Sequence, residues 1–335
     1  MERVPGMIAV VGAAGTIGRK VVEFLEGWGA PARPLDFRFE GDGHVDARDE
    51  GSVARALGGA AVCVNCADYR LNLEVMRGAL ASGTHYVDLG GLFHMTRRQL
   101  ELDGDFRSAG LTGILGMGSA PGKTNLLARA AVERLGAEPR RLEIWAATRD
   151  PGAAGHPFPA PYSVQTLLDE LHMEPMIVAD GELKAVEPLS GAAEREFPEP
   201  VGRATGIYTL HSELATLPDA YPTLHDASFR LCLSPGLLDG LLALGDGDEH
   251  PEPYAQSPAS VAVHLVEAAN GDGRQVVGMT VTSGGSARST SEPAARAAVE
   301  LAEGRLSAPG VHPPEAAVPD PEAFLAQLDT EVRWS

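Results

Sequence analysis

A short glycine-rich turn near the start of the chain constrains the fold more than any other feature. The sequence Gly12-Ala-Ala-Gly-Thr-Ile-Gly18 follows an apolar segment at residues 7–12, which predicts a strand, and precedes a helical apolar pattern at residues 16–27. In a βαβ unit such glycines permit a tight bend, close approach of a pyrophosphate and close packing of helix on strand, while the helix N-terminus binds the anion. The turn therefore predicts a dinucleotide-binding site formed by Gly12, Ala14, Gly15, Thr16, Ile17 and Gly18.

Short apolar segments alternate with helical patterns through the first 117 residues. Further strands are predicted at residues 32–37, 44–47, 61–67, 85–89 and 112–117, and further helices at 50–57, 71–81 and 95–109. Such alternation is typical of a parallel sheet with crossover helices. The predicted fold class is therefore α/β, a doubly wound Rossmann sheet with a second, α+β domain.

The pattern changes beyond residue 120. Strands are predicted at residues 142–148, 176–178, 182–186 and 275–282, helices at 121–135, 163–171, 260–269 and 293–303, and a polar, proline-rich break at 246–253. A length of 335 residues favours two domains. We predict a dinucleotide-binding domain at residues 1–120, an α+β substrate and dimerisation domain at 121–285, and a helical segment at 286–335 that returns to the first domain.

Composition excludes several classes of partner. The formal charge of −19 would repel nucleic-acid phosphates, so no nucleic-acid partner is predicted. The chain has no apolar run long enough to cross a membrane, and its start lacks the basic and apolar regions of a signal peptide. Three cysteines argue against a disulfide framework, so we predict a cytoplasmic protein. No group of His, Cys and carboxylate residues has zinc-site spacing, so no metal is predicted.

Charged residues after the second predicted strand bear on the choice between NAD and NADP. Asp36 is placed to accept hydrogen bonds from the adenosine ribose hydroxyls, which favours NAD. Arg33 and Arg38 lie near enough in the sequence to bind the 2′-phosphate of NADP, so both cofactors remain candidates. Asp46 and Ala47 are predicted to lie near the adenine.

Six segments of the chain, in order, carry a resemblance to a known family. They are Val64-Asn-Cys-Ala-Asp-Tyr-Arg70, Gly83-Thr-His-Tyr-Val-Asp-Leu-Gly-Gly91, Gly116-Met-Gly-Ser-Ala-Pro-Gly-Lys-Thr-Asn125, Asp180-Gly-Glu-Leu-Lys-Ala-Val-Glu-Pro-Leu-Ser-Gly191, Leu214-Ala-Thr-Leu-Pro218 and Gly310-Val-His-Pro-Pro-Glu315. The sequence resembles the saccharopine dehydrogenase superfamily, most closely its lysine 6-dehydrogenase-like and saccharopine reductase-like members. The resemblance implies a homodimeric NAD(P)-dependent oxidoreductase that converts an amine to an imine, with a small amino acid or amine as substrate.

Residues at the end of the predicted strand 61–67 are candidates for ligand contact. Asn65, Cys66 and Ala67 are predicted to contact the cofactor, because the carboxyl edge of this sheet is where ligands bind. Tyr69 is a candidate catalytic residue. Arg70 is placed either to clamp a substrate carboxylate or to cap the sheet at the surface.

Further candidates lie on later segments. Asp88 ends the strand 85–89 and is a candidate catalytic residue, because a carboxylate is costly to bury without partners. His211 and Glu213 would share one face of an extended segment and offer a base and an ammonium partner. Lys123 is predicted either to pair with a substrate carboxylate or to lie in solvent, and Asn125 is a further candidate substrate ligand.

Other function classes are weighed on specific residues. A short-chain dehydrogenase needs a Tyr-x-x-x-Lys pair, which no lysine of the chain completes. Cys63 and Cys66 would point to opposite faces of a strand, so they are predicted to be structural thiols rather than a shared metal or redox site. Two alternatives remain: a non-catalytic NAD(P)-binding regulatory protein, and a semialdehyde dehydrogenase with Cys66 as nucleophile.

Overall fold

The computed structural model describes residues 6–156, 158–244, 251 and 254–335. The chain divides into two compact units, one formed by residues 1–123 and 290–320 and the other by residues 124–289 and 321–335. Of the polar, proline-rich break predicted at residues 246–253, only Pro251 is described. Within the described part of the chain, no helix is both long and apolar enough to cross a membrane.

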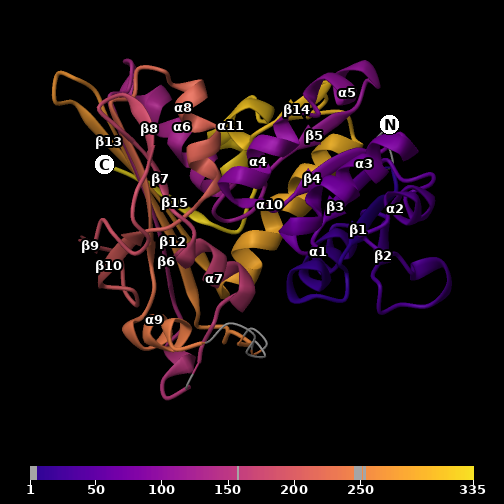
Figure 1. Ribbon diagram of the computed structural model, residues 1–335, viewed down its shortest axis with the longest axis horizontal. Helices are drawn as coiled ribbons and strands as arrows, with labels where there is room; N and C mark the ends of the chain where they lie inside the picture. Colours follow the sequence, from indigo (N-terminus) through magenta and orange to yellow (C-terminus); the bar gives the residue numbers. More distant parts are fainter. Residues whose placement is uncertain (1–5, 157, 245–250, 252–253) are drawn as a thin grey trace. The chain divides into compact units, whose positions relative to one another are not determined.

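The first unit is built on a six-stranded sheet in the order β14-β5-β4-β3-β1-β2, in which every pairing is parallel. The strands are β1 (Ile8–Val11), β2 (Ala32–Leu35), β3 (Val62–Asn65), β4 (His85–Asp88), β5 (Thr112–Ile114) and β14 (Gly310–His312). The connecting helices are α1 (Thr16–Gly27), α2 (Glu50–Ala56), α3 (Asn72–Ser82), α4 (Leu92–Leu100) and α5 (Asp103–Ser108), with short turns η1 (Gly41–Gly43) and η2 (Tyr69–Leu71) and the helix α11 (Pro314–Ala317) (Figure 1). The Rossmann prediction is confirmed.

The strand predicted at residues 44–47 is wrong. These residues are described and form only an isolated bridge between His44 and Asp36, because the Asp46 side chain accepts a hydrogen bond from the Arg48 N–H and closes a turn. The sixth strand of the sheet is instead β14, from the far end of the sequence. The helix predicted at residues 95–109 is divided into α4 and α5.

The second unit contains a nine-stranded mixed sheet in the order β15-β13-β12-β6-β11-β10-β9. Its strands are β6 (Arg141–Arg149), β9 (Ala193–Glu196), β10 (Arg203–Tyr208), β11 (Asp226–Cys232), β12 (Val261–Ala269), β13 (Gln275–Ser283) and β15 (Glu331–Trp334), and the hairpin of β7 (Met176–Ala179) and β8 (Glu182–Ala185) joins through β11. The helical segments are α6 (Lys123–Leu135), η3 (Pro151–Ala153), α7 (Val164–His172), η4 (Ser212–Ala215), α8 (Leu217–Ala220), α9 (Pro235–Leu242), α10 (Gly285–Ala302) and α12 (Pro321–Leu325). Helix α10 continues into the first unit from Thr290 onward.

Two helix predictions in this half need correction. Residues 260–269 form strand β12, not a helix, because this central strand is buried on both faces and its nearly continuous apolar sequence lacks a period that separates helix from strand. Helix α10 begins at Gly285, so Pro293 lies inside it rather than at its start.

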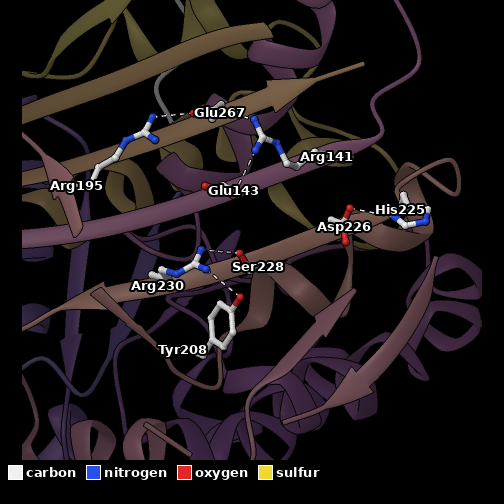
Figure 2. Close-up of polar contacts among 9 residues, drawn as sticks. All are labelled: Arg141, Glu143, Arg195, Tyr208, His225, Asp226, Ser228, Arg230 and Glu267. Atoms are coloured by element: carbon white, nitrogen blue, oxygen red, sulfur yellow. Dashed lines mark hydrogen bonds and ion pairs between the residues drawn. The ribbon is translucent and has the colours of Figure 1, made fainter. Parts of the chain in front are cut away.

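The sheet of the second unit curls around an apolar core that includes Trp145, Phe197 and Leu265. On β12, Glu267 is 5% exposed and is bound by Arg141 of β6 and, at 2.8 Å, by Arg195 of β9 (Figure 2). In a flat sheet β9 and β12 would be separated by four strand spacings of about 4.8 Å, farther than an arginine reaches. The Arg195–Glu267 pair therefore holds the sheet in its curled form.

Replacing Glu267 should loosen this curl. Glu267→Ala removes the acceptor of two guanidinium groups, so we expect the free energy of unfolding to fall by about 2 kcal/mol in urea titrations. Glu331→Ala is the matched control, because its pair with Arg333 is exposed and should contribute little. Equal losses in the two variants would contradict a specific role for Glu267.

Candidate active site

A cavity of 410 Å³ lies in the first unit at the point where the strand order reverses, between the carboxyl ends of β1 and β3. In doubly wound sheets this switch point is where nucleotides bind. The cavity is lined by Val11, Gly12, Gly15, Asp36, Phe37, Arg38, Val45, Asp46, Ala47, Arg48, Cys66, Ala67, Asp68 and Leu71. The sequence predictions therefore converge on one place for Gly12, Gly15, Asp36, Arg38, Asp46, Ala47, Cys66 and Ala67.

The glycine turn is required by its neighbours. Gly12 has φ of +82°, and a Cβ there would lie 2.7 Å from the backbone N of Ala67. A Cβ on Gly18 would lie 2.2 Å from the Gly12 carbonyl oxygen. At Gly15 a Cβ would meet only that same oxygen, at 3.3 Å, so this position opens toward the cavity. Close packing therefore requires glycine at positions 12 and 18, and glycine at position 15 leaves the helix N-terminus accessible from the cavity.

Helix α1 presents its N-terminus as an anion site. Its N-cap is Gly15, and within the described chain no side chain caps it and no acidic residue lies in its first turn. The first N–H groups of a helix lack internal acceptors and carry partial positive charge. This end of α1 therefore suits the pyrophosphate of a dinucleotide. Thr16, Ile17 and Gly18 lie in the helix itself and are not among the residues that line the cavity.

Asp36, at the end of β2, is 2% exposed and bound from three sides. Its carboxylate accepts hydrogen bonds from the Ala14 N–H and from both the backbone N–H and Nε of Arg38, each at 3.0 Å. Burial acts to raise the pKa of Asp36, but the Arg38 and Ala14 hydrogen bonds outweigh it and hold the pKa below its usual range. Asp36 is therefore ionised at neutral pH and faces the cavity as a carboxylate.

The arginines near Asp36 in the sequence bind different partners. Arg33 donates to the carbonyl oxygens of Ala56 and Gly58 and lines a separate cavity beside α2, not the cavity that Asp36 and Arg38 line. Arg48, which sequence reasoning missed, lines the cofactor cavity and binds Asp46 through two hydrogen bonds of 2.9 Å. Those hydrogen bonds lower the pKa of Asp46 to about 2.

Asp88 lies at the carboxyl end of β4, 1% exposed, inside a hydrogen-bond network. One carboxylate oxygen accepts from the N–H groups of Gly116 and Gly90, at 2.6 and 3.0 Å, and the other from Gln99 at 2.6 Å and Asn72 at 3.3 Å. Burial raises the pKa of Asp88 and these donors oppose it. Because Asp88 accepts hydrogen bonds from four donors, it fixes the position of the loop that begins at Gly116. Gly116 is also the first residue of the segment 116–125 that carries the family resemblance.

Asn65, predicted to contact the cofactor, has its side chain in the same network. It donates to Asn72 Oδ1 at 2.9 Å and to the Tyr86 hydroxyl at 3.2 Å, and its Oδ1 accepts from the Ala67 N–H. The side chain of Asn65 therefore acts on the backbone at Ala67 rather than facing the cavity. His85 accepts from the Thr112 N–H, as expected of a structural imidazole.

Tyr69 and Arg70 follow Asp68, which lines the cavity. The Arg70 guanidinium lies over the Tyr69 ring, 5.0 Å from its centroid, and binds Asp68 at 3.2 Å. Tyr69 is half-buried and Arg70 is exposed. Lys123 is fully buried, which excludes the solvent-exposed alternative, and Asn125 is 1% exposed.

Cys66 lines the cavity but is a poor nucleophile. Burial is the main cause that raises the pKa of its thiol well above the usual range, and the Asp88 carboxylate raises it further. A nucleophilic cysteine needs the opposite shift. Cys63 and Cys66 are free thiols, which agrees with their predicted structural role.

His211 lies in the second unit between the carboxylates of Glu170 and Glu213, and all three side chains are buried. Its Nε2 is 3.7 Å from Glu170, its Nδ1 is 3.5 Å from Glu213, and its ring stacks on Phe229 at 3.7 Å. At these distances both contacts are ion pairs rather than hydrogen bonds. Sequence reasoning paired His211 with Glu213 but missed Glu170, which comes from α7 and has no sequence signal linking it to this segment.

The two glutamates are held by hydroxyl donors and control the charge of the imidazole. Tyr162 donates to Glu170 and Thr124 donates to Glu213, both at 2.6 Å. Burial alone would lower the pKa of His211, but Glu170 and Glu213 raise it to about 9. His211 is therefore an imidazolium at neutral pH. In the described residues, no group of three or more His, Cys, Asp and Glu side chains is arranged to hold a metal ion.

The raised pKa of His211 predicts a pH-dependent stability. Because the folded state holds this proton more tightly, its contribution is complete below pH 6.5 and is lost as the pH rises toward 9. We expect the free energy of unfolding to fall by roughly 3 kcal/mol more across this range in wild type than in His211→Gln. The control His225→Gln, at an exposed histidine, should keep the wild-type slope in urea titrations. Parallel slopes for wild type and His211→Gln would refute the ion-paired imidazolium.

Comparison with known proteins bears on the first unit and on the fold. Residues 41–114 match the family model for the saccharopine dehydrogenase NADP binding domain. Carboxyaminopropylagmatine dehydrogenase from Synechocystis sp. is 25% identical over 192 residues, which cover 56% of this chain and 48% of that protein, so this chain spans about half the length of that relative. Saccharopine dehydrogenase (L-Glu forming) from Saccharomyces cerevisiae has a similar structure, with a TM-score of 0.68 and 13% identity over 98% of this chain and 100% of that one.

The matched domain contains Asp46, Arg48 and the loop from Asn65 to Arg70, and the structural likeness extends over both units. These findings agree with the resemblance that the sequence motifs indicate: residues 41–114 are similar to the NADP binding domain of saccharopine dehydrogenases, and the chain has the fold of the Saccharomyces cerevisiae protein.

Proposed function

We propose that this protein is an NAD(P)-dependent dehydrogenase that acts on the carbon–nitrogen bond of an amino acid, of the lysine 6-dehydrogenase or saccharopine reductase type. One observation carries the proposal. The cavity at the strand-order switch point combines the uncapped N-terminus of α1 with the carboxylate of Asp36, and most of its remaining lining comes from residues 41–114, which match an NADP-binding domain. That combination suits a dinucleotide, and the relatives supply the class of substrate.

The names of the relatives support an amine substrate. One relative is a dehydrogenase of carboxyaminopropylagmatine and the other is a saccharopine dehydrogenase. We infer that the substrate here is likewise a small amine or amino acid. We further propose a homodimer, which the resemblance supports, and a cytoplasmic location, which the small number of cysteines favours.

The chemistry of the proposal balances with the cofactor and water as the only co-reactants. A bound nicotinamide would supply the hydride acceptor for the carbon that bears the amine, and loss of a proton from the nitrogen would leave an imine. Water adds to the imine and releases a carbonyl compound and an amine. The chain must therefore hold the substrate carboxylate, orient the amine and exchange protons.

Particular residues suit these tasks. We propose that Arg70 binds the substrate carboxylate and that Tyr69 contacts the substrate beside it. Asp88, with four donors, would act by positioning the Gly116 loop, which leads to Lys123 and Asn125. His211 is held as an imidazolium, so it suits proton donation in the direction of amine formation, with Glu213 as its acceptor for the return of a proton.

NAD is the proposed cofactor in preference to NADP. Asp36 presents a buried, ionised carboxylate at the end of β2. Such a group accepts hydrogen bonds from a ribose 2′-hydroxyl and repels a 2′-phosphate. The semialdehyde dehydrogenase alternative is disfavoured by the raised pKa of the Cys66 thiol.

A substrate panel tests the proposal. The protein is incubated with NAD or NADP and with lysine, ornithine, diamines and secondary amines that carry carboxylates, and reduced nicotinamide is followed by absorbance. We expect turnover with at least one member and the reverse reaction from the matching carbonyl compound and amine. Binding of cofactor in calorimetry with silence across the panel in both directions would favour a non-catalytic NAD(P)-binding protein instead.

Arg70→Ala tests the carboxylate site. Loss of a charge-assisted contact should raise the KM of a carboxylate-bearing substrate by roughly tenfold to a hundredfold, with a smaller effect on kcat. Arg77→Ala is the control, because Arg77 is also exposed and paired with a carboxylate, Glu50 of α2. A carboxylate-free amine should lose little in either variant. Unchanged KM values in Arg70→Ala would exclude this role.

A further inference from the structure

Three turns of the same kind surround the cofactor cavity. Each has the sequence Asp-x-Arg, in which the aspartate accepts a hydrogen bond from the backbone N–H of the arginine and also binds its guanidinium. They are Asp36-Phe-Arg38, Asp46-Ala-Arg48 and Asp68-Tyr-Arg70. The backbone hydrogen bond fixes the carboxylate directly beside the arginine side chain, so each pair is preorganised by its own turn.

Two of these turns lie on the adenosine side of the cavity, after β2. Arg38 lies with its Nε 3.0 Å from Asp36, and Arg48 binds Asp46 with both Nε and Nη2 at 2.9 Å. Arg38 and Arg48 are 52% and 76% exposed, so both guanidinium groups border solvent at the rim. Their positive charge is nonetheless matched by a carboxylate in contact.

A 2′-phosphate carries more charge than a ribose hydroxyl and is bound by arginine through paired N–H donors. Here the Nε and Nη2 edge of Arg48 already faces Asp46, and Asp36 adds a buried negative charge close to the ribose position. Arg33, the remaining arginine near β2, is turned toward the carbonyl groups that follow α2. The arginines needed for NADP are thus present, but each is engaged elsewhere.

We propose that Asp36 and Asp46 set cofactor selectivity by holding Arg38 and Arg48 away from a 2′-phosphate, so that removing either carboxylate converts its arginine into a phosphate ligand. The inference rests on the proposed function of dinucleotide binding. In this inference Asp46, which lies outside β2, contributes to cofactor selectivity. Arg38 and Arg48 do not contact bound NAD, and each can bind a 2′-phosphate only when its aspartate is replaced.

The two positions differ in what their replacement disturbs. The Asp46–Arg48 pair is at the surface, so Asp46→Asn should leave folding intact. Asp36 also accepts from the Ala14 N–H beside the glycine turn, so Asp36→Asn should weaken binding of NAD as well as improve binding of NADP. Asp46→Asn is therefore the cleaner variant, and Asp36→Asn supplies an independent second one.

Isothermal titration calorimetry with NAD and NADP tests the inference without any substrate. In wild type we expect NAD to bind at least about tenfold more tightly than NADP. Asp46→Asn should tighten NADP roughly three- to tenfold relative to NAD. The double variant Asp46→Asn with Arg48→Ala should lose that gain, because the freed guanidinium is its source. Asp42→Asn on η1 makes the same change in net charge and should leave the ratio unchanged.

Each outcome has one meaning. Tighter binding of NADP than NAD by wild type, or an unchanged ratio in either Asp46→Asn or Asp36→Asn, would overturn the inference. A gain that survives Arg48→Ala, or that Asp42→Asn reproduces, would assign it to net charge and also overturn it. If wild type bound neither nucleotide, that result would refute the proposed function itself, so the two failures are distinguishable.

Discussion

The close approach of the β1 and β3 ends at Gly12 is the constraint on which the first unit depends. With no Cβ at this position, the backbone of Cys66 and Ala67 passes within contact distance of the turn, and a side chain would collide with it. This contact sets the start of α1 and the position of the β3 loop together. The cavity lies between these two segments, so its shape follows from backbone packing rather than from the side chains that line it.

The buried polar groups Asp88, in the first unit, and His211, in the second, are stabilised by different interactions. In the first, Asp88 receives four donors and Asn65 connects it through Asn72 to the β3 loop, so the carboxyl edge of the sheet is held by satisfied hydrogen bonds. In the second, His211 is held by charge and by stacking on Phe229. The first arrangement is a network of hydrogen bonds to one carboxylate. The second depends on a proton, and such a group is able to exchange it.

Local patterns in the sequence predict what local forces determine. The helix at residues 16–27 and the hairpin around Asp180 are found where the sequence places them, because amphipathic spacing and turn chemistry act over a few residues. Strand β14 pairs with β5 across the length of the chain, and the apolar segment 260–269 reads equally as helix or strand. Glu170 reaches His211 only through tertiary packing. The Asp-x-Arg turns are local too, but sequence reasoning did not identify them, because the hydrogen bonds that define them are seen only in the structure.

The charges around the cavity explain how an acidic chain accommodates an anionic cofactor. The net charge of −19 would oppose a dinucleotide if it extended to the binding site. At the rim each aspartate is paired with an arginine two residues away, so the local charge is close to neutral and long-range repulsion is reduced. Recognition of the pyrophosphate then falls to the backbone N–H groups of α1, which carry fixed dipoles and do not titrate. With the anion bound by backbone, the arginines after β2 can stay paired with Asp36 and Asp46, and the carboxylate of Asp36 is left to act on the ribose position, where the choice between a hydroxyl and a phosphate is made.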